Sequence, residues 1–254
     1  MQYQKPPVVE VGIVFDFYPS AETPKWDQGP VERFFQNKKV NIAFPKAGAV
    51  YQQQVQVTSD LQNQTSSTTT FTPTICEFIA RGVETHKLLS IAQNRMSYRL
   101  GRKGNEYPRY GLVSNLIFGM LPIYQSVWQP ERIKNATLSY VDVIEFSEQE
   151  INLDEYFNLK FSFPDGLGVA GSMEGHIAFP EEKGYKDIVF RQVPSKKGNV
   201  VFQFFWTASR QIDTNNTTDV TVKQELDLLH SELIESFEAS FTEKCKKLFN
   251  PSYE

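Results

Sequence analysis

A long apolar stripe near the C-terminus constrains the fold more than any other feature of this sequence. Apolar side chains recur there every three or four residues, at Val222, Leu226, Leu229, Leu233, Phe237, Phe241, Cys245 and Leu248. The spacing predicts one amphipathic helix over residues 222–249, with Thr221 and Gln224 as its capping box. Asn250-Pro251 ends the pattern. At ~1.5 Å per residue this helix would be about 42 Å long, so we expect it to be a structural part of the core, packed on a broad apolar surface.

Alternating segments supply such a surface. Over residues 7–17 every second side chain is apolar, and the same alternation recurs over residues 135–146 and 199–210. Period-two alternation is typical of strands with one apolar and one polar face. We therefore expect an antiparallel sheet with helices on its apolar face.

The predicted elements occur in the same order twice. After strand 7–17, the first half contains a helix that begins at Pro30 and ends at Phe44-Pro45, strands near 51–57, 75–81, 86–92 and 95–100, and a helix from Pro108 in which Pro122 is expected to cause a kink or an early end. A loop is expected over residues 59–74. The second half contains strand 135–146, a short helix from Asn152, a second Phe-Pro pair at Phe163-Pro164, strands near 169–179, 187–193 and 199–210, and the last helix.

This repetition indicates an ancient duplication. We expect an α+β fold made of two pseudo-repeated β-α-β(3-4)-α halves, which form a curved antiparallel sheet covered on one face by long helices. The halves span residues 1–130 and 131–254 and pack as one globular unit. The 20 Phe, 11 Tyr and 3 Trp predict a thick aromatic core.

Composition excludes several classes of protein. With 40% hydrophobic and 22% charged residues, the chain of 254 residues is an ordinary globular sequence. Its net charge of −4 favours neither nucleic acid nor anionic membrane, and no segment has the length of a membrane span. No signal peptide is seen, so the cytoplasm is the expected location. Cys76 and Cys245 lie far apart, which excludes a zinc ribbon, and both are expected to be reduced and buried.

No motif of a known catalytic or cofactor site is present. We therefore expect no cofactor and no metal, and the sequence favours a protein that is not an enzyme. The three histidines, His86, His176 and His230, lack ligand spacing, and His230 is expected to border the apolar stripe.

Asp142 is the most informative single residue, because alternation places it on the apolar face of strand 135–146 beside Tyr140. A buried carboxylate without a partner costs several kcal/mol or takes up a proton. A cation, a Tyr hydroxyl or a backbone N–H at the sheet end could satisfy it. Alternatively, Asp142 and Tyr140 anchor a ligand in a cleft between sheet and helix, with Trp206 of strand 199–210 also a candidate binding residue.

Arg99 is the fourth candidate binding residue. It belongs to a basic cluster, Arg95, Arg99, Arg102, Lys103 and Arg109, with Tyr98, Tyr107 and Tyr110 interleaved. Basic and aromatic groups on a concave sheet could hold single-stranded nucleic acid.

Several motifs resemble those of a sporadically distributed family of uncharacterised bacterial proteins of about this length. They are Pro6-Pro7-Val8-Val9-Glu10, Phe44-Pro45, Leu138-Ser139-Tyr140-Val141-Asp142, and a C-terminal helix with Leu229-His230, Phe237-Glu238, Ser240, Thr242 and Leu248-Phe249. The family usually has Arg and Asn where this chain has Ser139 and Asp142. It also usually has acidic residues in the strand that here reads FQFFWTAS. The resemblance implies no assigned activity, and the family's patchy distribution suggests accessory loci of the toxin–antitoxin or phage-defence type.

Three functions are consistent with these observations. The leading hypothesis is a regulatory module that binds another protein through its sheet face or long helix, with homo-oligomerisation left open. The first alternative is a small-ligand binder or enzyme with a pocket between sheet and helix. The second is a single-stranded nucleic-acid binder.

Overall fold

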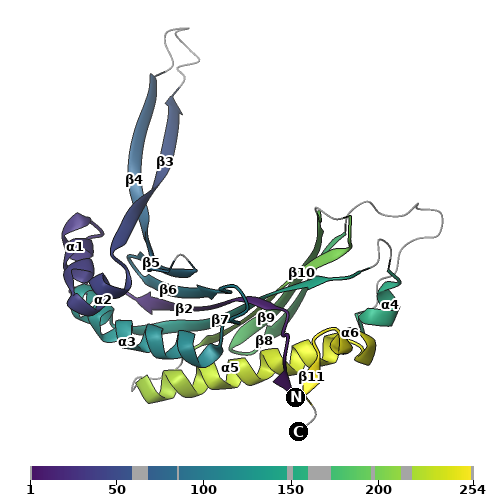
Figure 1. Cartoon of the computed structure of the whole chain (residues 1–254). Helices are drawn as coiled ribbons and strands as arrows, with labels where there is room; N and C mark the ends of the chain where they lie inside the picture. Colours follow the sequence, from purple (N-terminus) through teal and green to yellow (C-terminus); the bar gives the residue numbers. More distant parts are fainter. Residues whose placement is uncertain are drawn as a thin grey trace.

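The computed structural model describes residues 2–58, 68–84, 86–147, 151–159, 173–195, 198–212 and 219–252. These residues form an α+β fold around a nine-stranded antiparallel sheet (Figure 1). In spatial order its strands are β3 (Lys46–Thr58), β4 (Thr68–Arg81), β5 (Lys87–Ala92), β6 (Arg95–Gly101), β2 (Val8–Tyr18), β7 (Arg132–Glu145), β10 (Val201–Gln211), β9 (Gly184–Val193) and β8 (Glu174–Glu181). A separate pair, β1 (Gln2–Tyr3) and β11 (Pro251–Ser252), joins the two ends of the chain. The α+β class expected from the sequence is therefore confirmed.

The centre of the sheet is the antiparallel pair β2 and β7. Val11 lies opposite Tyr140 and Ile13 opposite Leu138, and the side chains of all four residues are buried. On the other side of β7, Trp206 of β10 lies opposite Tyr140. The alternation in the sequence thus predicted the buried face of three adjacent strands.

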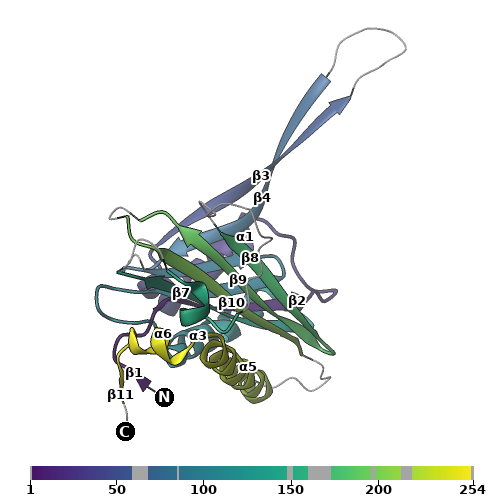
Figure 2. The ribbon, with the colours of Figure 1, turned by 90° about the vertical axis from the view of Figure 1, so that its right-hand side faces the viewer.

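Six helices are present in the described residues. They are α1 (Gln28–Gln36), α2 (Lys38–Ala43), α3 (Tyr110–Trp128), α4 (Leu153–Tyr156), α5 (Asp219–Ser240) and α6 (Glu243–Lys247). Helix α3 packs against β6 and β2, and α5 packs against β7 and β10. Figure 1 shows both long helices along the lower side of the sheet, and Figure 2 shows α5 beneath β10 from another direction.

Aromatic rings fill the space between sheet and helices. Under α3, the ring of Tyr124 stacks on Phe17 and on Trp128, with centroids 4.6 and 4.7 Å apart. Under α5, the edge of Phe241 meets Phe204, with centroids 5.2 Å apart. The predicted aromatic core is therefore present under both long helices, α3 and α5.

The prediction of one uninterrupted C-terminal helix is wrong. Helix α5 begins at Asp219, so Thr221 lies within it and is not its cap. The helix ends at Ser240 because Phe241 forms a β-bridge with Phe157. Thr242 then caps α6, its hydroxyl accepting from the Cys245 N–H at 3.3 Å.

The end of the stripe also differs from expectation. Leu248 is 46% exposed, whereas the adjacent Phe249 is buried. Cys245 is buried with a free thiol, as expected, while the side chain of Cys76 lies outside the described residues.

Other element boundaries required correction. The first helix begins at Gln28, capped by Asp27, so Pro30 is not its first residue. It gives way to α2 at Asn37, whose side chain accepts from the Lys39 N–H. Helix α3 begins at Tyr110 and continues through Pro122 to Trp128. The second Phe-Pro pair and residues 169–172 lie outside the described residues.

The predicted loop over residues 59–74 is too long, because β4 begins at Thr68 and pairs with β3 along its whole length. Only Phe78–Arg81 of β4 pair with β5. The rest of the hairpin therefore forms a two-stranded arm, which projects from the body of the molecule in both views (Figures 1 and 2). We call residues 50–58 and 68–77 the arm.

Candidate functional site

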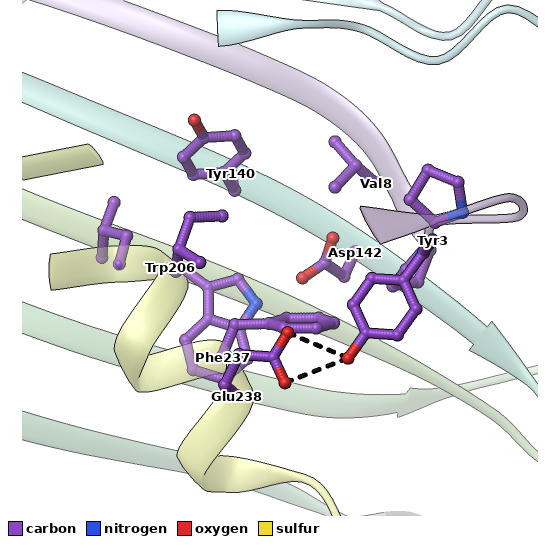
Figure 3. A pocket seen from close by; sticks show the side chains of 11 residues that line it. Tyr3, Val8, Tyr140, Asp142, Trp206, Phe237 and Glu238 are labelled. Carbon is purple, nitrogen blue, oxygen red and sulfur yellow. Dashed lines mark hydrogen bonds between the residues drawn. The ribbon is translucent and has the colours of Figure 1, made fainter. Parts of the chain in front are cut away.

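Three of the four predicted binding residues meet at one end of the buried sheet face. Tyr140 and Asp142 follow one another on the inner face of β7, and Trp206 lies on the inner face of β10. Together with α5 and the N-terminal segment they line a pocket (Figure 3). We call it the Asp142 pocket.

The walls of the Asp142 pocket are mainly apolar. Helix α5 contributes Leu233, Ile234 and Phe237, and the segment before β2 contributes Tyr3, Pro6, Pro7 and Val8. Its volume of about 110 Å³ approaches that of an engineered cavity of roughly 150 Å³ that binds benzene. The pocket therefore has space for a group close to one aromatic ring in size.

The two ends of the chain hold one wall in place. The Tyr3 hydroxyl hydrogen-bonds to the Glu238 carboxylate, 2.9 Å from Oε1 and 3.0 Å from Oε2 (Figure 3). The Tyr3 ring also packs edge-on against Phe249, with centroids 5.5 Å apart. Burial and the neighbouring Glu238 raise the pKa of Tyr3 above its usual value. Tyr3 and Glu238 are 235 residues apart in the sequence. No sequence pattern therefore indicated that Tyr3 belongs to this site.

Asp142 is the polar group that distinguishes this pocket. Its side chain lies between Val8, Tyr3 and the Trp206 indole (Figure 3), and only 1% of its surface is exposed. Neither carboxylate oxygen forms a well-aligned hydrogen bond with a described residue, and the Trp206 indole N–H beside it has none either. Burial raises the pKa of Asp142 from 3.8 to about 7, although its interaction with the Trp206 N–H acts in the opposite direction. The expected cation, hydroxyl or backbone partner is thus absent from the described structure.

The Tyr140 hydroxyl, in contrast, has a partner. It hydrogen-bonds to Nδ1 of His230 at 2.7 Å, and the Tyr110 ring stacks on His230 with centroids 4.4 Å apart. The Tyr110 hydroxyl donates in turn to Asp227 at 2.7 Å. Burial raises the pKa of Tyr140 and lowers that of His230. His230 borders the apolar stripe as expected, but the sequence did not indicate its bond to Tyr140.

Arg99 does not belong to this site. It lies opposite Gly12 on the exposed face of β6, whereas the adjacent Tyr98 is buried against Phe44 in the core. Residues that follow one another in a strand point to opposite faces, so Arg99 and Tyr98 are separated. Of the other residues in that basic and aromatic cluster, Arg102 lies over the Tyr107 ring, 4.6 Å from its centroid. Binding of single-stranded nucleic acid by this cluster remains a prediction from the sequence.

A second pocket contains charged groups that neutralise each other. It lies between β5, β6 and the start of α3, and Glu84 within it forms ion pairs with Lys87 at 2.7 Å and Lys103 at 2.5 Å. These lysines lower the pKa of Glu84 to about 2. Its carboxylate is already satisfied, unlike that of Asp142.

Neither the other features of the described residues nor the comparisons with known proteins identify a ligand for this site. The described residues contain no cluster of three or more His, Cys, Asp or Glu side chains suited to a metal ion. Within that part of the chain, no helix has the length and hydropathy needed to cross a membrane. Neither a scan against protein-family models nor a search of curated proteins finds a match. The function is therefore inferred from the chemistry of the pocket.

Proposed function

We propose that this chain is a binding protein for a small molecule that occupies the Asp142 pocket. The observation that carries the proposal is a fully buried carboxylate in an apolar pocket, with no well-aligned hydrogen bond among the described residues and only the Trp206 indole N–H as a neighbouring donor. An isolated buried carboxylate costs several kcal/mol, and a bound ligand can provide the missing partner. This favours the small-ligand alternative over the protein-binding hypothesis.

The surrounding groups favour binding over catalysis. A reaction that uses both a general acid and a general base needs a second titratable group free to exchange a proton with the substrate. In this pocket the Tyr140 hydroxyl is hydrogen-bonded to His230. The Glu238 carboxylate accepts a hydrogen bond from Tyr3 and lies 3.2 Å from Nζ of Lys246. Asp142 is then a recognition group, with Trp206 and Phe237 providing aromatic surface.

Methyl NMR with benzyl alcohol as a neutral, ring-sized probe tests this proposal. We expect probe-dependent shifts at Val8, Leu233 and Ile234, and loss of the shifts at Val8 and Leu233 in Ile234→Trp, which fills the mouth of the pocket. Leu228→Trp is the matched control, because Leu228 is exposed on the same helix but does not line the pocket. Absence of shifts at millimolar probe, or shifts that survive Ile234→Trp, would overturn the proposal.

A second candidate function, self-association through the arm, is favoured by the arm's backbone. In the described structure the two strands of the arm pair only with each other. β4 pairs with β5 only from Phe78 to Arg81, which lie outside the arm. An unpaired strand edge is a template for another strand, and charged residues normally protect it. The only charged residue in the sequence of the arm, residues 50–58 and 68–77, is Glu77 at its base. We propose a second copy of this chain as the partner, because two identical edges can pair about a twofold axis.

Sedimentation velocity measures this self-association directly. We expect a dimer for the full chain and a monomer for Gln54→Lys/Gln56→Lys, in which the paired arms would bring like charges together. Gln224→Lys, on the exposed surface of α5, is the control and should remain dimeric. A monomeric wild-type chain at tens of micromolar would rule this function out.

We further propose that the two halves are structural repeats with their helices on one common face. The order β4-β5-β6-β2 in the first half corresponds to β8-β9-β10-β7 in the second, with β2 and β7 adjacent at the centre. Each long helix follows the last strand of its half, β6 before α3 and β10 before α5. The family resemblance, the cytoplasmic location and a role in a bacterial accessory system remain predictions from the sequence.

A further inference from the structure

We infer that the ligand of the Asp142 pocket carries a protonated amine on an apolar body about the size of one aromatic ring. This inference rests on the proposed function and specifies its ligand class. It follows from which charges line the pocket, which of them are already compensated, and what surrounds the one that is not.

The charge balance of the pocket is negative. Its lining residues include two carboxylates, Asp142 and Glu238, and no Lys, Arg or His. Glu238 is compensated by the Tyr3 hydroxyl and by Lys246, whose Nζ lies 3.2 Å away. Asp142 has the neutral Trp206 N–H as a neighbouring donor but no cation in the pocket lining. A cation is therefore the group that this pocket lacks, and an anion would be repelled by the carboxylate.

The position of Asp142 also favours a cation attached to an apolar group. The carboxylate lies on the sheet, and the apolar side chains of Leu233 and Phe237 from α5 form part of the wall around it. An ammonium group donates hydrogen bonds to carboxylate oxygens, and the aromatic faces of Trp206 and Phe237 attract cations. A metal ion is a poorer fit, because the described residues supply no cluster of three ligand groups here.

Protonation of Asp142 couples this binding to pH. The titratable groups that line the pocket with it are Tyr3, Tyr140 and Glu238, and His230 contacts Tyr140 from α5. Because the pKa of Asp142 is raised to about 7, the Asp142 side chain is protonated in a fraction of the protein molecules at neutral pH. An amine stabilises the ionised form, so its binding should strengthen between pH 5.5 and 8 and release a proton near pH 6.

Isothermal titration calorimetry with three probes of similar shape tests the inference: benzylamine, benzyl alcohol and benzoate. At pH 8 we expect benzylamine to bind about tenfold or more tighter than benzyl alcohol, as a charge-assisted hydrogen bond implies, and benzoate to bind weakest. The advantage of benzylamine should disappear in Asp142→Asn and persist in Glu235→Gln, which removes an exposed charge from α5, the helix that lines the pocket. Titrations at pH 6 in buffers of different ionisation enthalpy should show proton release on benzylamine binding. This wild-type measurement applies even if Asp142→Asn fails to fold.

The outcomes separate the two claims. Equal affinity for benzylamine and benzyl alcohol, or no proton release, would overturn the amine assignment and leave the small-molecule pocket standing. Failure of all three probes to bind at millimolar concentration would overturn both.

Discussion

At the scale of single residues, Asp142 links the stability of the protein to pH. Its pKa is raised from 3.8 to about 7 in the folded protein, so the native state binds the proton more tightly than the unfolded chain does. The contribution of Asp142 to stability is then greatest below pH ~4 and is lost as pH rises through 7. At ~1.36 kcal/mol per pKa unit, the loss is on the order of 4 kcal/mol.

Urea unfolding of the wild type and Asp142→Asn at several pH values measures this loss. We expect the stability of Asp142→Asn relative to wild type to increase between pH 4 and pH 8, because the amide cannot ionise. The free energy of unfolding of the Glu235→Gln variant, in which an exposed residue is replaced, should differ from that of the wild type by a constant amount over the same pH range. A constant difference for Asp142→Asn as well would show that this carboxylate is not destabilised by burial.

The sequence could predict part of the site at this scale. Period-two alternation along β7 placed Asp142 and Tyr140 on the buried face, and the structure confirms both as buried. The contacts of Tyr3 with Glu238 and of Tyr140 with His230 could not be predicted, because they join residues 235 and 90 positions apart. Such contacts depend on how the helices and strands pack against one another, which local sequence patterns do not specify.

At the scale of elements, α5 is a part of the core and not a detachable tail. Leu229 is fully buried on its inner face, whereas the adjacent Leu228 is 51% exposed. These neighbours form a matched pair on one helix turn. We expect Leu229→Ala to lower the free energy of unfolding by ~2–5 kcal/mol and Leu228→Ala by less than about 0.5 kcal/mol. Similar losses in urea titrations of the two variants would mean that α5 does not pack as described.

The helix boundaries show where sequence periodicity stops being informative. The apolar spacing continues past Ser240, but the backbone N–H of Thr242 donates to the Tyr156 carbonyl at 3.0 Å and the helix ends. A tertiary hydrogen bond thus overrides the local preference. In the arm, the sequence predicted a strand near residues 51–57 but assigned residues 68–74 to a loop, whereas they belong to β4 and pair with β3.

At the scale of the whole molecule, the predicted halves 1–130 and 131–254 meet at β2 and β7. These strands pair in register from Glu10 to Asp16 of β2, so each half alone would expose a long central strand edge. We expect neither half to unfold cooperatively when expressed alone, and the co-expressed halves to form a complex with a single thermal transition. A half that melts cooperatively on its own would show that the chain contains two independent domains.

The pKa of Asp142 is the most direct test of the central claim, that a buried carboxylate with no cation and no well-aligned donor beside it lines the pocket. Carbon-13 NMR can follow its carboxyl carbon through a pH titration of the free protein, with Asp142→Asn identifying the signal. The structure predicts a midpoint near 7. A midpoint at or below 4 would show that the ionised carboxylate is already stabilised inside the protein, which contradicts the proposed role of Asp142 in ligand binding.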